Sequence, residues 1–200
     1  MHPNAAFDWT SRDEMLEFVS NQSFAHIFTS SEQGLFVVHA PVLVTADASI
    51  RFHVSRRNRV AAQLADRHVL ISVAGREAYH SANWYASANQ VPTWHYEAVE
   101  VEGAARTLSD EELVELLDQL SDRFEREHSP EQPWTRAKME PGRFEAMTKA
   151  IVGFDVVPSE IRGTRKFNQH KAGADLQAGM DGQLRAGRQD IVSAMRDLSA

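Results

Sequence analysis

A basic turn at residues 55–58, with the sequence Ser-Arg-Arg-Asn, is the first candidate for chemistry. It follows a β-rich run that ends at Ser55, and Asn58 can cap a brief helix that carries Val60 and Leu64. A helix N-terminus offers unpaired N–H groups and a positive dipole end, and two adjacent guanidiniums complete a site for a phosphate monoester. Because a solvated basic turn that pairs with surface carboxylates has the same spacing, the residues alone leave both interpretations open.

Aromatic residues crowd into a second segment. Trp84 and Tyr85 are followed by residues 91–96, Val-Pro-Thr-Trp-His-Tyr. Flat rings beside a rigid turn can form stacking and hydrogen-bonding walls for a planar heterocycle. The alternative is packing in a core or at a dimer interface, where Trp and Tyr concentrate, and the spacing alone favours packing.

Two further segments carry polar side chains at predicted strands. His39 and Pro41 lie in the run 35–44, and because proline cannot donate to a β-ladder we expect an edge or a bulge there, where backbone groups face a ligand. A lone strand histidine is more often structural than catalytic. Residues 165–170, Arg-Lys-Phe-Asn-Gln-His, form a polar and basic cluster after the last predicted strand that can reach the polar edge or phosphate of a ligand.

Several other chemistries are excluded by the residue types. The sequence has no cysteine, which excludes disulfides, thiolate metal sites and a thiol nucleophile. The histidines are scattered without an H-x-H or H-E-x-x-H pattern, so no metal site is predicted. The sequence also lacks the G-x-S-x-G, G-x-G-x-x-G and Walker patterns of hydrolases, dinucleotide-binding domains and P-loop enzymes. No catalytic residue is predicted.

Two capping-box patterns mark helix starts, Ser11 with Glu14 and Ser109 with Glu112. The second opens a helix over about residues 109–128, whose apolar stripe consists of Leu113, Leu116, Leu117, Leu120 and Phe124. Pro141 can lie in the first turn of another short helix.

The elements between these helices are predicted strands, separated by Gly, Asn and Asp turn residues. They cover residues 24–30, 35–44, 50–55, 69–74, 78–81 and 93–106, with a last strand within 151–161 that Pro158 breaks. This pattern predicts a mainly β fold with helical decoration, an α+β domain or a barrel. We expect one domain over residues 1–170 and a tail over residues 171–200 that contains a helix.

The charge balance constrains the partners. The chain has a formal net charge of -7, whereas a protein that grips DNA through its phosphates needs a basic face, so direct DNA binding by this chain is disfavoured. No apolar run reaches the ~20 residues that cross a bilayer, and the first residues do not form a signal peptide. We expect a cytoplasmic protein without a membrane partner.

These segments, in this order, resemble the PaiB family. The resemblance spans roughly residues 7–170, and its most specific parts are the V-P-T-W-x-Y stretch and the I-V-G-F stretch. The segments that carry it are Phe24-Ala25, residues 39–43, 53–58, Trp84-Tyr85, and residues 91–96, 151–154 and 166–169.

The resemblance implies an FMN-binding split β-barrel of the kind shared by pyridoxamine-phosphate oxidases and flavin reductases, with a homodimer that holds FMN at its interface. It assigns three groups of residues. The residues expected to bind the FMN phosphate are Ser55, Arg56, Arg57 and Asn58. Those expected to contact the ring and the ribityl chain are His39, Ala40, Pro41, Val42 and Leu43. Contacts from one or other subunit are assigned to Trp94, Tyr96, Lys166 and Gln169. One departure concerns the last group, because family members often carry Leu-Ser-Gln-Asn where this chain has Phe-Asn-Gln-His at residues 167–170.

Two functions follow from the resemblance. The family is described as negative transcriptional regulators, in which flavin occupancy or redox state would alter a dimer surface seen by a protein or DNA partner. The alternative is an FMN-dependent oxidoreductase, such as a flavin reductase or a pyridoxamine-phosphate-oxidase-like enzyme, because the flavin itself carries the chemistry. A haem-handling split barrel is a third, weaker interpretation.

Overall fold

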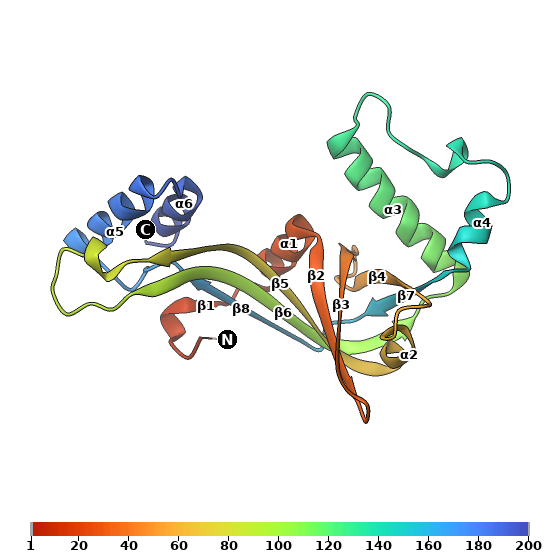
Figure 1. The fold of residues 1–200 in the computed structure, drawn as a ribbon, viewed down its shortest axis with the longest axis horizontal. Coiled ribbons are helices and arrows are strands. Elements are labelled where there is room, and N and C mark those ends of the chain that lie inside the picture. The colour runs from red at the N-terminus through yellow and green to blue at the C-terminus, as the bar shows by residue number, and fades with distance from the viewer. Residues whose placement is uncertain (1, 200) are drawn as a thin grey trace. The chain divides into compact units, whose positions relative to one another are not determined.

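The computed structural model describes residues 2–199, so Met1 and Ala200, the outer ends of the two predicted regions, lie outside the described residues. The chain forms two compact units (Figure 1). The barrel unit consists of residues 16–73 and 100–161, and the extension unit of residues 2–15, 74–99 and 162–199. Strands β5 (Arg67–His80) and β6 (Thr93–Thr107) contribute to both units.

The barrel unit is a closed antiparallel sheet. Its other strands are β2 (Phe24–Ser31), β3 (Gly34–Val44), β4 (Ile50–Ser55) and β7 (Ile151–Val156). Their order is β6-β5-β2-β3-β4-β7, and β7 pairs again with β6, which closes the ring. Closure is a general way to remove exposed sheet edges. The predicted fold class, mainly β with helical decoration, is confirmed.

Alternating side chains fill the barrel. Along β4 the apolar residues Ile50, Phe52 and Val54 are buried, and Phe52 lies opposite Phe154 of β7 with ring centroids 5.5 Å apart. This period of two is what a strand with one core-facing side requires. Pro158 separates β7 from β8 (Glu160–Lys166), as predicted, whereas the predicted break between residues 74 and 78 is wrong because β5 runs through Gly75.

Helix α3 (Asp110–His128) covers the barrel from outside and packs against β3, β4 and β7 (Figure 1). Its predicted capping box is present, with the Glu112 amide donating to Ser109 Oγ at 3.2 Å and the Ser109 amide donating to Glu112 Oε2 at 2.8 Å. The predicted stripe is buried at Leu113, Leu116 and Leu120. The barrel unit also contains α2 (Ala61–Leu64), η3 (Arg136–Lys138), α4 (Arg143–Thr148) and part of α1 (Arg12–Gln22).

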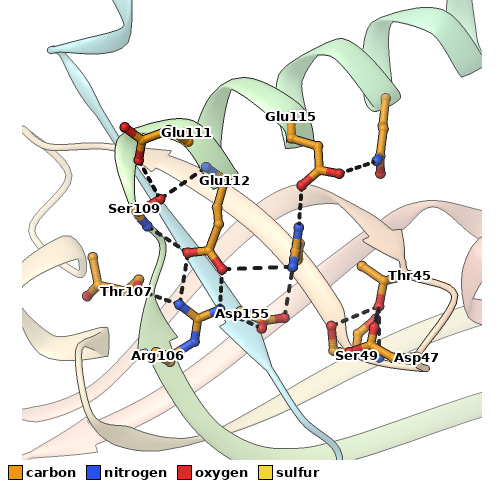
Figure 2. A network of polar contacts seen from close by, with 12 residues as sticks. Thr45, Asp47, Ser49, Arg106, Thr107, Ser109, Glu111, Glu112, Glu115 and Asp155 are labelled. Carbon is orange, nitrogen blue, oxygen red and sulfur yellow. Dashed lines mark hydrogen bonds and ion pairs between the residues drawn. The ribbon is translucent and has the colours of Figure 1, made fainter.

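A polar network fastens the start of α3 to the barrel (Figure 2). Arg106 donates hydrogen bonds to Glu112 at 2.8 Å and to the buried Asp155 of β7 at 2.9 Å. The guanidinium of Arg51 on β4 lies 3.6 Å from the same Asp155 and 3.3 Å from Glu115. The hydrogen bonds from Arg106 lower the pKa of Glu112 to about 2. The network therefore ties β4, β6 and β7 to the start of α3.

We predict that Asp155→Ala lowers the free energy of unfolding by about 2 kcal/mol, because it leaves two arginines without their shared, mostly buried partner. Glu115→Ala is the control. Its side chain is 56% exposed against 9% for Asp155, and the loss should stay below about 1 kcal/mol. Urea denaturation measures both values. Equal losses would show that the network does not anchor the helix.

The extension unit is a smaller sheet with helices. Its strands have the order β1 (Asp8–Trp9), β8, β6, β5, and its helical elements are η1 (Ala5–Phe7), η2 (Ala82–Trp84), α5 (Gly173–Arg185) and α6 (Gln189–Asp197). A separate hydrophobic cluster joins them, formed mainly by Ala78, Phe167, Met180, Ile191 and Met195. Within residues 2–199 no helix is both long and apolar enough to cross a membrane.

Candidate functional site

The basic turn lies where β4 ends, but it does not open a helix as predicted. The amides of Arg56, Arg57 and Asn58 all donate within the protein, to Ala150 O at 2.9 Å, Ser55 Oγ at 3.2 Å and Ser55 O at 2.9 Å. Helix α2 has four residues and begins only after Val60, which caps it without a side-chain hydrogen bond.

Asn58 has a different role from the predicted N-cap. Its Oδ1 accepts from the Val60 amide at 3.1 Å, which closes a turn ahead of the helix. An asparagine side chain readily mimics a backbone turn in this way. The predicted helix start at Asn58 is therefore wrong, and because the amides of residues 56–58 already donate within the protein, the guanidiniums are the groups at these positions left to bind an anion.

The guanidiniums of Arg56 and Arg57 are available for a ligand. Both side chains are exposed, and neither makes a polar contact with another residue in the described part of the chain. Arg56 also lines a cavity of about 310 Å³ whose other walls are the small and apolar residues Ala61, Ala62, Ala65, Thr107, Val152 and Phe154. The free guanidinium of Arg56 beside small side chains, with that of Arg57 next along the turn, fits the phosphate end of FMN.

The strand segment from His39 to Leu43 divides between two faces. Ala40, Val42 and Leu43 are buried. His39 is exposed, and its ring packs edge-on against that of His26, with the ring centroids 4.7 Å apart. Pro41 lies opposite Phe24, one residue before pairing with β4 begins at Val42. β3 is thus an interior strand, and the missing N–H of proline falls where the ladder to β4 stops. The contacts of these five residues with FMN stay a prediction.

In the extension unit, the aromatic segment and the basic cluster of residues 165–170 together line one cavity. It measures about 250 Å³ and is lined by Tyr85, Val91 and Thr93 from the aromatic segment and by Lys166, Asn168 and His170 from the basic cluster, among others. Lys166 Nζ donates to Thr93 Oγ1 at 2.7 Å. Burial lowers the pKa of both Lys166 and His170.

The other predicted residues of the extension unit are placed less favourably for a ligand. Trp94 is 56% exposed, and its ring packs edge-on against that of Tyr79, with the ring centroids 6.0 Å apart. Tyr96 is half-buried. The Gln169 amide accepts from the Phe167 amide at 2.8 Å and donates to Arg165 O, so it closes a turn of the chain itself. The roles of Trp94, Tyr96, Lys166 and Gln169 toward FMN stay predictions.

The sequence analysis missed a buried pair of histidines, His80 and His95. Both side chains are fully buried, and His95 Nε2 lies 2.8 Å from His80 Nδ1. His95 Nδ1 donates to the Lys166 carbonyl at 3.2 Å, so its Nε2 must accept from His80 Nδ1. Their positions, in phase with the buried Ala78 and Val99 of the same strands, were the signal that could have identified them.

We predict that this pair stays neutral well below the usual range for histidine. Burial lowers the pKa of His80 to about 4 and that of His95 to about 3. The unfolded chain protonates both groups near pH 6.5 and the folded chain does not, so stability should fall as the pH falls from about 6.5 toward 4. NMR titration of the histidine Cε1 protons should find at least two of the nine histidines neutral at about pH 5. Titration of all nine above that pH would contradict it.

A closed six-stranded barrel with a basic turn on the rim of a cavity defines the class, a split β-barrel. Two solved structures share the fold. The FAD and heme binding protein from Mycobacterium smegmatis has a TM-score of 0.61 at 16% identity, covering 90% of this chain and 80% of that one. The flavocytochrome Anf3 from Azotobacter vinelandii has a TM-score of 0.61 at 16% identity, covering 86% and 73%.

The sequence comparisons identify the family within this class. The model of the family described as "Putative FMN-binding domain" matches residues 1–160, and the chain belongs to that family, whose cofactor is FMN. The protein "Protease synthase and sporulation protein PAI 2" of Bacillus subtilis (strain 168) is 30% identical over 173 residues, which cover 84% of this chain and 82% of that protein. The predicted PaiB resemblance and the predicted cofactor are confirmed.

Proposed function

We propose that this chain is a cytoplasmic FMN-binding homodimer that regulates transcription through a partner, with Arg56 and Arg57 holding the flavin phosphate. The observation that carries the proposal is the unpaired guanidinium of Arg56 on a cavity with small side chains, followed in the chain by the equally unpaired Arg57, in a member of an FMN-binding family. When bound, FMN supplies reversible electron transfer. The residues of the chain bind and orient it.

The phosphate assignment is tested by Arg56→Ala/Arg57→Ala. Removing two charge-assisted contacts should weaken FMN binding by roughly a hundredfold or more while the fold is kept. The control Arg67→Ala/Arg143→Ala removes the same charge from exposed positions of the same unit and should retain FMN. Flavin absorbance of the purified proteins and titration of apoprotein with FMN measure the effect. Unchanged affinity in the first variant would refute the assignment.

The outer face of the β2–β3 hairpin supports the homodimer. The cross-strand pairs His26 with His39 and Phe28 with Val37 lie on this face, with Phe24 and Leu35 at the ends. Phe24 is 55% exposed and Leu35 85% exposed. An apolar patch of this kind on a folded protein typically marks an interface. A second copy with the same face would cover it, because isologous dimers bury one patch against itself.

We expect Phe28→Glu to convert the dimer to a monomer, because a two-fold interface would then bury two unpaired carboxylates. Leu184→Glu on α5 is the matched control, since Leu184 and Phe28 are each 41% exposed, and it should remain dimeric. Light scattering coupled to size exclusion reports the mass of each variant. A monomeric parent protein, or a dimer that both variants leave intact, would contradict the assignment.

Two observations support the regulatory role, the negative net charge of the chain and the name of its Bacillus subtilis relative. Because the chain carries a net charge of -7, we propose that it reaches the promoter through a protein partner. The Bacillus relative is named for protease synthesis and sporulation.

A second candidate is an FMN-dependent oxidoreductase. The cavity of about 250 Å³ favours it, because Lys166, Tyr85 and His170 offer hydrogen-bonding groups for a small anionic substrate. Rapid bleaching of bound FMN by NADPH would support this enzyme. Slow bleaching, together with retention of a promoter fragment only in the presence of a partner protein, would support the regulator.

A further inference from the structure

The barrel unit has a second cavity, on the other side of the strands that carry the FMN site. It measures about 310 Å³ and lies beneath the connector between α3 and α4. His53 and Ile151 line it, whereas Val152 and Phe154 line the cavity at Arg56. Successive residues of a strand point to opposite faces, so the two cavities lie on opposite sides of β4 and β7.

The walls of this cavity are aromatic and sulfur-containing. Trp134, Phe144, Met139 and Met147 line it, and methionine and aromatic side chains pack favourably against ring systems. An apolar protein cavity of about 150 Å³ holds one benzene ring, so the volume of about 310 Å³ suits a molecule of two fused rings.

One polar group of a residue that lines the cavity lacks a partner. The buried Nδ1 of His53 makes no hydrogen bond to any residue between 2 and 199. A buried imidazole nitrogen without a partner costs free energy that a ligand hydroxyl can recover, because a hydroxyl donates or accepts as the tautomer requires. Burial lowers the pKa of His53, which favours the neutral ring near pH 7 and so disfavours an anion.

Polar contacts hold the connector over the cavity. Arg136 lies 3.3 Å from Asp118 of α3 and 5.4 Å from the centroid of the Phe144 ring, and the Trp134 amide donates to Glu125 at 2.8 Å. These contacts keep the aromatic wall in place. Asp118 also lines the cavity and disfavours a ligand with a negative charge.

We propose that the cavity between α3, α4 and β4 binds a neutral, two-ring aromatic molecule that carries a hydroxyl group, with the hydroxyl on His53 Nδ1 and the rings between Trp134 and the methionines. This site is separate from the FMN site. In a regulator it would receive an effector.

The probe is 2-naphthol, titrated into the FMN-loaded protein by calorimetry. We expect a dissociation constant on the order of 10–100 µM and binding about tenfold weaker for 2-methylnaphthalene, which lacks the hydroxyl. His53→Phe should abolish this difference. NMR of the methionine methyl groups should show shifts at Met139 and Met147.

Matched variants separate this site from the FMN site. Ser121→Phe places a ring in the cavity and should abolish naphthol binding with FMN content unchanged, while Gln119→Phe, on an exposed position of the same helix, should bind normally. Arg56→Ala/Arg57→Ala should bind naphthol even without FMN. The proposal is overturned if 2-naphthol does not bind, if FMN displaces it, or if the methyl shifts arise elsewhere.

Discussion

The pairing of β7 with β4 on one side and β6 on the other is the constraint on which the barrel unit depends. Phe154 lies opposite Phe52, and Val156 opposite both Ile50 and Ala105. Without β7, the ring of strands would open between β4 and β6 and expose the core they enclose. Because β4 ends directly at Ser55, the same pairing fixes where the basic turn leaves the barrel.

The close approach of α3 follows from one glycine in β7. A Cβ at Gly153 would lie 2.7 Å from Leu108 Cδ1 and 3.0 Å from Leu113 Cδ1, so a larger residue here would force both leucines to shift. The capping box and the arginine–carboxylate network then fix the start of the helix on the outside of the barrel.

The alternation of side chains along β4 and β7 gives the two faces different chemistry. On the face of Val152, the exposed guanidinium of Arg56 lies beside small side chains, which suits a phosphorylated ligand. On the face of His53, a neutral imidazole stands among aromatic rings and thioethers, which suits an uncharged one. Two ligands of different charge can therefore use one pair of strands without competing for the same groups.

The sequence by itself determined the elements that local rules govern. The capping box at Ser109, the stripe from Leu113, the break at Pro158 and the mainly β pattern all depend on neighbouring residues, and all are present in the structure. The tertiary structure decided what depends on distant residues. Asn58 closes a turn ahead of α2, His80 meets His95 across two strands, and His53 faces a connector about eighty residues further along the chain. Spacing along the chain carries no information about such meetings, because strand pairing and helix packing bring these side chains together only in the folded state.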